Sequence, residues 1–261
     1  MSNENRVEGF QSGGQVDAGA RYGSEYLDWK DWNPETFGVL SKHEEADISA
    51  KLRKSKAVLP PRCRVLEIGF GNGSFLAYGA KRQWEMHGTE VNAGLLERAR
   101  QRGFRVVHAD SFNLFPDNHF DMVAAFDVLE HLPQDDLLNF LRDIQRVLVD
   151  GGVFIARFPN GDSPFGSFFQ NGDPTHMTAI GSLKVRYLAR ELGVELVYVG
   201  GEPQSLFAGL PYFAHRILAI PTKYLMNLFV NLIMFPRYEV SFFSPNLVSV
   251  FRVVKPAIPA R

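Results

Sequence analysis

Short segments rich in apolar residues alternate with longer, more polar segments along the middle of the chain. The first run covers residues 64–68, and comparable runs follow over residues 84–90, 104–110, 120–126 and 153–156. Neighbouring apolar residues within such a segment, such as Val65 and Leu66, predict a strand that is buried on both faces, and the longer segments between these runs are of helical length. The pattern therefore predicts an α/β domain with a largely parallel sheet.

The pattern changes in the C-terminal third of the chain. A helix is predicted over residues 179–192, and strands are predicted over residues 194–199 and 246–254. Between these two strands lies a long segment rich in Leu, Ile, Phe and Met, which Pro221 and Pro236 interrupt. Proline ends or kinks a helix, so we expect these residues to divide the segment.

This apolar segment has three open interpretations. Its stretch over residues 225–235 has no charged side chain, and we expect it to be too short to span a bilayer, which needs about 20 apolar residues. The segment is interpreted as a pair of helices covering the active site, as a homodimer interface, or as a surface that rests on a membrane. The last two would use residues 204–240, and a membrane surface would direct Arg216, Lys223 and Arg237 toward headgroups.

The N-terminal part of the chain reads as a flexible tail followed by helices. Residues 1–20 are rich in Gly, Ser, Gln and Asn, and we expect them to be disordered. Tyr22, Tyr26, Trp29 and Trp32 then recur at near-helical intervals, in a helix that either buttresses the core or closes over it as a lid that excludes water. We expect one domain over residues 21–261, divided into a helical lid (21–58), a core (59–200), the apolar helical insertion (201–243), and a last strand with its tail (244–261).

Composition excludes several classes of function. The chain has 261 residues, of which 45% are hydrophobic, and its net charge of −1 gives no field that would recruit nucleic acid. Cys63 is the one cysteine, which excludes an internal disulfide, a zinc site made of cysteine pairs, and an iron–sulfur cluster. The first residues are polar, without the apolar core of a signal peptide, and we expect a cytoplasmic enzyme.

The most informative segment directly follows the first strand. Glu67, Gly69, Gly71 and Gly73 alternate with other residues, and a helix-like run begins at Ser74. Glycines at such a turn let a ligand lie against bare backbone, and the helix start supplies free N–H groups with a partial positive charge. The dinucleotide fingerprint G-x-G-x-x-G would need a third glycine at position 74, so a dehydrogenase is disfavoured.

The E-x-G-x-G-x-G pattern resembles the first motif of the class I S-adenosylmethionine-dependent methyltransferases. Three further segments in the order of that family follow it: a strand ending in Glu90, the Phe120–Leu132 segment that is similar to an FD-x-V-x-x-x-D-V-x-E-H motif, and a glycine turn at Gly151–Gly152. The resemblance covers residues 64–156. It implies a Rossmann-like seven-stranded sheet, mostly parallel with an antiparallel last strand, with helices on both faces and the apolar helical insertion before the last strand.

The resemblance also implies S-adenosyl-L-methionine as the cofactor and a set of residues that bind it. Glu90 would accept both ribose hydroxyls, and Asp110 would meet the adenine amino group. The alternative roles are a helix cap for Glu90 and a turn cap for Asp110. The expected cofactor-binding residues are Glu67, Gly69, Gly71, Gly73, Glu90, Val91, Asp110, Ser111, Phe112, Phe126, Asp127 and Tyr26.

Residues Asp173-Pro174-Thr175-His176 resemble an element of methyltransferases encoded with bacterial polysaccharide and lipid-modifying pathways. A hydroxyl acceptor needs a general base, and histidine has a suitable pKa. His176, oriented by Asp173, is the preferred catalytic base, and His131 is the alternative. The spacing of the acidic residues and histidines does not support a metal site, so we expect none.

The leading interpretation is an O-methyltransferase that acts on a small molecule, namely a sugar or glycolipid of a bacterial polysaccharide. The alternatives are an enzyme acting on a quinone, a prenylated lipid or a natural product, and a methyltransferase-like module that only binds. We expect a small-molecule acceptor and no nucleic acid as partners. Residues 204–240 would add a homodimer contact or a peripheral contact with the inner membrane.

Overall fold

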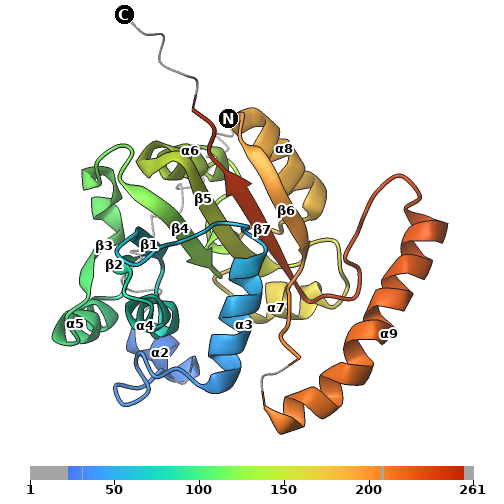
Figure 1. The fold of residues 1–261 in the computed structure, drawn as a ribbon, viewed down its shortest axis with the longest axis horizontal. Helices are drawn as coiled ribbons and strands as arrows, with labels where there is room; N and C mark the ends of the chain where they lie inside the picture. The colour runs from blue at the N-terminus through green and yellow to red at the C-terminus, as the bar shows by residue number, and fades with distance from the viewer. Residues whose placement is uncertain (1–22, 31, 207–208, 256–261) are drawn as a thin grey trace, which may run out of the picture.

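The computed structural model describes residues 23–30, 32–206 and 209–255, so the expectation for residues 1–20 lies outside the described part. One sheet of seven strands forms the centre, in the order β3-β2-β1-β4-β5-β7-β6 (Figure 1). The strands are β1 (Arg64–Ile68), β2 (Glu85–Glu90), β3 (Arg105–His108), β4 (Phe120–Phe126), β5 (Leu148–Pro159), β6 (Glu195–Gly201) and β7 (Asn246–Arg252). The first five strands pair in parallel and β7 runs antiparallel to both neighbours, which confirms the expected sheet.

Alternate residues along each central strand enter two separate hydrophobic clusters, one on each face of the sheet. Val65 and Met122 pack on one face, while Leu66 and Val123 pack on the other. All four side chains are buried, as expected for neighbouring apolar residues in a parallel sheet covered on both faces. The helices that cover the two faces are α3 (Lys42–Arg53), α4 (Ser74–Lys81), α5 (Ala93–Gln101), α6 (Leu137–Val147) and α8 (Ser182–Leu192).

The N-terminal segment packs on the core and also reaches the edge of the sheet where the parallel strands end. Its short helix α2 (Ser24–Trp29) is followed by an irregular stretch that leads to α3. Leu27 and Phe37 are buried in the same cluster as Val65. Helix α3 begins at a complete capping box, in which Ser41 and Glu44 exchange side-chain and backbone hydrogen bonds.

The apolar segment before β7 folds differently from the expectation. A single helix, α9 (Leu210–Met234), runs through Pro221 for 25 residues, so the expected pair of helices is wrong. The expected length is wrong as well. Among the described residues, Pro211–Met234 is a helix long and apolar enough to cross a membrane, with a hydropathy of 1.5 and 0% of its most apolar window buried. Figure 1 shows α9 standing beside the sheet rather than over it, joined at one end by the residues after β6.

Candidate active site

The loop between β1 and α4 has a backbone that favours glycine at three positions. Gly69, Gly71 and Gly73 have φ angles of 63°, 51° and 74°, which residues other than glycine rarely adopt. Space is short there too, because a Cβ added to Gly71 would lie 2.7 Å from the ring of Trp32. The N-terminal segment therefore lies directly on the glycine loop, as a lid or a buttress would.

Two buried acids flank this loop. Glu67 lines the cavity described below, and its Oε2 has no hydrogen-bond partner among the described residues. Burial raises the pKa of Glu67 well above its usual range, and nearby Glu90 adds to the effect. Such an oxygen is suited to a hydrogen-bond donor or a positive group on a ligand.

The carboxylate of Glu90 fixes the glycine loop in place. It accepts hydrogen bonds from the backbone N–H groups of Gly71 at 3.0 Å, Val91 at 2.8 Å and Asn92 at 3.1 Å. Burial raises the pKa of Glu90, and these three N–H groups oppose the rise. The expected hydrogen bonds from the ribose hydroxyls to Glu90 stay a prediction, because in this structure the carboxylate accepts from backbone N–H groups.

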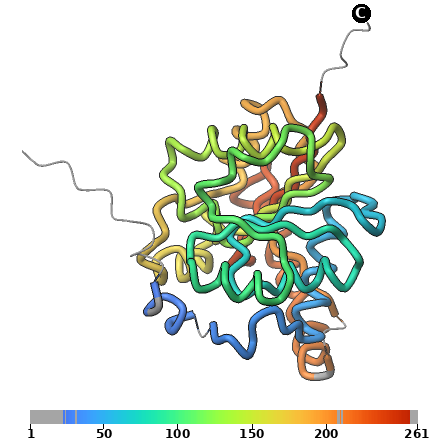
Figure 2. Tube along the Cα trace, turned by 90° about the vertical axis from the view of Figure 1, so that its left-hand side faces the viewer, coloured from blue at the N-terminus to red at the C-terminus, as the bar shows by residue number. Residues whose placement is uncertain are grey.

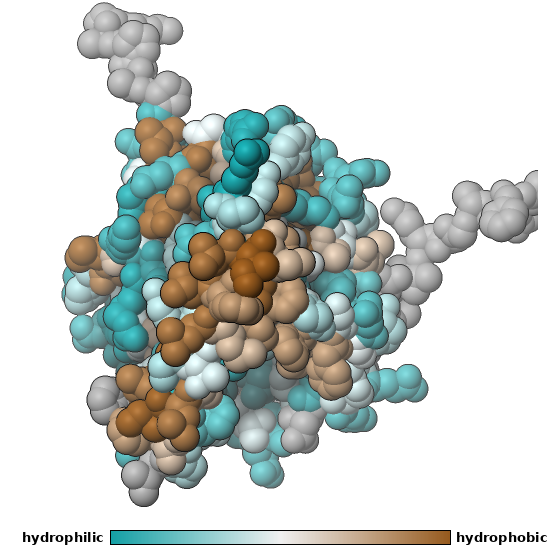
Figure 3. All heavy atoms as spheres, turned by 90° about the vertical axis from the view of Figure 1, so that its right-hand side faces the viewer, coloured by the Kyte–Doolittle hydropathy of each residue, from teal (hydrophilic) through white to brown (hydrophobic). Residues whose placement is uncertain are grey.

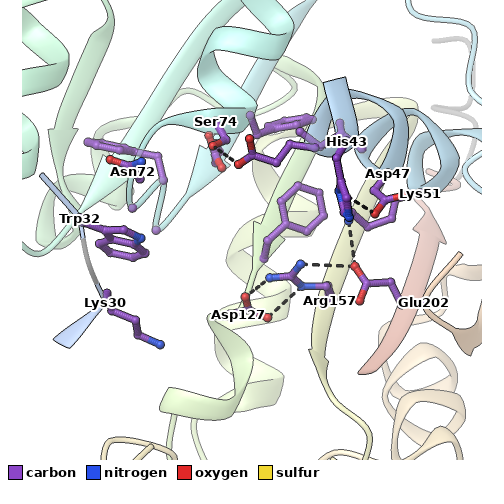
Figure 4. A pocket seen from close by; sticks show the side chains of 18 of the residues that line it. Lys30, Trp32, His43, Asp47, Lys51, Asn72, Ser74, Asp127, Arg157 and Glu202 are labelled. Atoms are coloured by element: carbon purple, nitrogen blue, oxygen red, sulfur yellow. Dashed lines mark hydrogen bonds and ion pairs between the residues drawn. The ribbon is translucent and has the colours of Figure 1, made fainter. Parts of the chain in front are cut away.

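A cavity of about 550 Å³ opens beside the glycine loop, at the carboxyl ends of the parallel strands (Figure 4). Open α/β sheets place their ligands at this edge. Part of its lining is the loop itself, and the rest combines charged side chains with aromatic and aliphatic ones from the N-terminal segment, from α3, from the strand ends and from α9. Besides Glu67 and the glycine loop, the lining includes Tyr26, Lys30, Trp32, His43, Asp47, Lys51, Phe126, Asp127, His131, Arg157, Glu202 and Arg216.

Arg157 is the centre of a charge network in this cavity, in which Lys51 is buried, Arg157 and Glu202 are half-buried, and Asp127 is exposed. Its guanidinium donates to Asp127 and, at 3.3 Å, to Glu202, which also accepts from Lys51 at 2.8 Å. Burial alone would raise the pKa of Glu202, but Arg157 and Lys51 outweigh it and hold that pKa at about 2. Asp127 has a φ of 57°, an uncommon conformation that clusters at functional sites.

Arg216 joins α9 to α3 at the margin of the cavity. Its guanidinium makes two hydrogen bonds to the carboxylate of Asp47, at 2.9 and 2.8 Å, and only 4% of the residue is exposed. His43, on the same helix as Asp47, lies 3.3 Å from the guanidinium. Figure 2 shows α3 in blue and α9 in orange side by side.

The two candidate bases occupy different positions. His131 lines the cavity, whereas His176 is not among the described residues that line it. The centroids of the two imidazole rings lie 4.6 Å apart. Nδ1 of His131 lies 3.0 Å from Oγ1 of Thr175, and that hydroxyl donates to Oδ1 of Asp173 at 2.5 Å. Because the hydroxyl proton goes to Asp173, Nδ1 of His131 is the donor to Thr175. Its Nε2 is then the unprotonated nitrogen.

Burial lowers the pKa of both histidines, and that of His131 falls to about 4. The Nε2 of His176 lies 3.7 Å from Oδ2 of Asp173 and 3.9 Å from Oε1 of Glu130. Lys30 brings its ammonium to 3.2 Å from the same Oδ2. Asp173 thus connects Lys30, His176 and, through Thr175, His131.

Glu130, His131 and His176 offer ligand atoms within 4.8 Å of one another, an arrangement that could hold a metal ion. Both carboxylate oxygens of Glu130 are buried without a hydrogen-bond partner among the described residues. Burial raises the pKa of Glu130 well above its usual range, and Asp127 contributes to the rise. A neutral, protonated Glu130 explains the same geometry without a metal.

Six expected cofactor residues lie outside the described lining of the cavity, namely Gly73, Glu90, Val91, Asp110, Ser111 and Phe112. Asp110, Ser111 and Phe112 lie in a 3₁₀ helix (Ala109–Leu114) after β3. The side chain of Asp110 is 91% exposed and pairs with His108, and the ring of Phe112 packs on Phe140. Their proposed contacts with adenine stay a prediction.

Sequence reasoning did not assign Lys51, Arg157, Glu202 or Arg216 to the site. The sequence does contain a signal for Arg157, because this charged residue stands between the apolar residues 153–156 and Phe158. Glu202 lies 45 residues further along the chain. Its place beside Arg157 depends on the sheet order, in which β7 lies between β5 and β6.

Comparisons with known proteins agree with this geometry. Residues 66–156 match the family model of a methyltransferase domain. The chain is 35% identical over 107 residues to a 27-O-demethylrifamycin SV methyltransferase of Amycolatopsis mediterranei, covering 36% of this chain and 39% of that protein. The chain spans about half or less of the length of the curated relatives it matches.

Solved structures show the same fold. A SAM-dependent methyltransferase from Archaeoglobus fulgidus superposes with a TM-score of 0.61 at 18% identity, over 88% of this chain and 100% of that one. A Burkholderia thailandensis 1,6-didemethyltoxoflavin-N1-methyltransferase with bound S-adenosylhomocysteine gives 0.55 at 14% identity, over 95% and 93%. Together with the sequence match, these likenesses support a class I methyltransferase domain with S-adenosylmethionine as its cofactor.

Proposed function

We propose that this methyltransferase domain transfers a methyl group from S-adenosylmethionine to a hydroxyl of a polar small molecule, a sugar or the sugar of a glycolipid. The observation that carries the proposal is the cavity that joins the glycine loop to the Arg157 network and to His131. The cofactor supplies an electrophilic methyl group when bound. The residues of the chain hold the two reactants together, remove the acceptor proton and exclude water.

The glycine loop and Glu67 would hold the cofactor. The backbone at Gly69 and Gly71 borders the cavity without a side chain, and the unpartnered Oε2 of Glu67 lies in the same lining. These features fit a ligand that carries a positive amino group and must lie close to the backbone. Trp32 and Tyr26 would close over it from the N-terminal segment.

His131 is the residue best placed to act as the base. It lines the cavity, and the Asp173–Thr175 pair fixes its Nδ1 as the protonated nitrogen. Its Nε2 can then take the acceptor proton, and the imidazolium that forms would be stabilised by Asp173 through the hydroxyl of Thr175. His176, which the sequence favoured, would instead position Asp173 from behind His131.

The lining also supports a polar acceptor over a prenylated one. The part of the cavity away from the glycine loop presents Lys51, Arg157, Glu202 and Asp47, which suit hydroxyl groups rather than an isoprenoid chain. Among the described residues of α9, Arg216 is the one that lines the cavity. The exposed apolar residues of α9 therefore do not form a hydrophobic substrate tunnel.

Two measurements test the proposal in sequence. Titration calorimetry with S-adenosylmethionine should show binding, and absence of heat would overturn the assignment of the cofactor site. Methyl transfer from labelled cofactor to a panel of sugars, glycolipids and quinones should then favour the sugar-bearing compounds. Cofactor binding without transfer to any acceptor would support the alternative of a methyltransferase-like binding module.

The base is tested with His131→Asn against an exposed histidine of α9, His215→Asn, as the control. We expect His131→Asn to lose transfer while keeping cofactor affinity, and His215→Asn to keep both. Full transfer by His131→Asn would contradict the proposed role.

A further inference from the structure

Helix α9 directs three of its polar residues toward the protein and many of its large apolar residues outward. Arg216, Asn227 and Asn231 recur at intervals that place them on one face of the helix. Leu218, Leu225, Phe229 and Leu232 recur on the opposite face, with exposed fractions of 72%, 62%, 64% and 73%. A helix on the surface of a water-soluble protein normally has the opposite arrangement, with its apolar face toward the protein and its polar face toward solvent.

The inward face is fixed by hydrogen bonds to the chain that returns from α9 to β7. The amide of Asn231 donates to the carbonyl of Val240 at 2.8 Å and accepts from its N–H at 2.9 Å. The side-chain oxygen of Asn227 accepts from the N–H of Phe243 at 3.1 Å. Because these bonds and the Arg216–Asp47 pair hold both ends of α9, the apolar face is directed outward by the fold itself.

The outward face forms a continuous apolar surface. Figure 3 views the molecule from the side of α9 and shows hydrophobic side chains gathered across this face. Large contiguous apolar patches are rare on soluble monomers and mark sites of interaction with a partner or a membrane.

The charges around this surface are almost all positive. From Pro203 to Tyr238 the sequence has no Asp or Glu. Arg216 is buried and paired with Asp47, so the exposed charges of this stretch are those of Lys223 and Arg237. Beside the end of α9, a hollow of about 420 Å³ is lined by Arg186, Arg190 and Arg237, with Glu239 as the one acid among the described lining residues. Arginines in a hollow are suited to phosphate groups.

We infer that the outward face of α9 lies in the surface of an anionic lipid bilayer, with its apolar side chains among the acyl chains and the neighbouring cations at the headgroups. A second copy of the chain is the less favoured occupant. Two such surfaces would bring their positive margins together, whereas anionic headgroups neutralise them.

The connection to β7 favours a helix that lies in the bilayer surface over one that spans it. Both neighbours of α9, strands β6 and β7, belong to the same sheet. Residues 235–245 run back along α9, as the bonds of Asn227 and Asn231 require, and they are not helical. Non-helical backbone exposed to lipid would leave its polar groups unsatisfied. The inference does not depend on methyl transfer.

The test is sedimentation of the full chain with vesicles made of phosphatidylcholine alone or mixed with phosphatidylglycerol. We expect binding that is at least tenfold stronger with the anionic mixture and that weakens as salt is raised. The double variant Leu225→Glu with Phe229→Glu should lose this binding at least tenfold. Val58→Glu, which changes a residue that is 92% exposed on another face, is the matched control.

Two further measurements keep the outcome decisive. Circular dichroism and cofactor titration should show that the double variant is folded, because both substituted side chains are already exposed. Lys223→Glu with Arg186→Glu should reduce binding to the anionic vesicles only. Binding of neither vesicle would overturn the inference, and so would a concentration-dependent dimer in sedimentation velocity that the double variant abolishes.

Discussion

The hydroxyl of Thr175 connects the imidazole of His131 to the carboxylate of Asp173, at 3.0 Å from Nδ1 and 2.5 Å from Oδ1. The three groups come from the loop after β4 and from the loop before α8, which lie far apart in the sequence. The connection assigns the tautomer of His131 and places its other nitrogen on the side of the ring away from Thr175.

Thr175→Val removes the hydrogen bonds of this hydroxyl with little change in side-chain volume. We expect it to lower turnover at least tenfold in a methyl-transfer assay while cofactor affinity in calorimetry stays the same.

A general base typically contributes about 10²–10⁴ in rate. His131→Asn should therefore lower turnover by about that factor, and His176→Asn should lower it by less, since His176 acts through Asp173. The two variants are compared in the same assay under saturating cofactor. A larger loss in His176→Asn than in His131→Asn would return the role of base to His176.

The Glu202 network predicts a dependence of stability on pH. The folded-state pKa of Glu202 is about 2, below the ordinary 4.5 of the group. The resulting stabilisation is fully present above pH 4.5 and is lost as pH falls toward 2. It is of the order of 3 kcal/mol. Urea unfolding should show Glu202→Gln to be destabilised at pH 7, and the difference from the native chain should shrink below pH 4. A difference that is constant with pH would contradict this account.

Gly71→Ala separates cofactor binding from backbone strain. A Cβ at Gly71 would meet Trp32 at 2.7 Å, whereas one at Gly103, with a φ of 82°, would meet nothing within 4 Å. Both substitutions should cost about 1–2 kcal/mol of stability in thermal or urea unfolding, because both place alanine at positive φ. We expect only Gly71→Ala to weaken cofactor binding, by at least tenfold in calorimetry. Equal affinities in the two variants would remove Gly71 from the cofactor site.

Metal removal tests the Glu130, His131 and His176 cluster. Lys30 already supplies a positive charge 3.2 Å from Asp173, beside this cluster, so we expect turnover to be unchanged after dialysis against EDTA. Loss of turnover that Mg²⁺ or Zn²⁺ restores would instead identify the cluster as a metal site.

The strands and the glycine loop could be predicted from the sequence because local patterns determine them. Val65 and Leu66 are both buried, as neighbouring apolar residues in a strand require, and the alternating glycines mark a turn of positive φ. The charged part of the cavity could not be predicted in this way. Arg157 and Glu202 lie close together through the order of β5, β7 and β6, which no local pattern encodes. The length of α9 was underestimated because Pro221 was read as a break, although the helix continues through it.

The indole of Trp32 rests on the same bare backbone at Gly71 that a nucleoside would need. Any molecule that enters or leaves along this backbone must first displace that ring. The rate at which the spent cofactor is replaced would then depend on how often the ring of Trp32 moves away from the loop. Replacing Trp32 by a residue with a smaller side chain would weaken retention of the cofactor and speed its exchange.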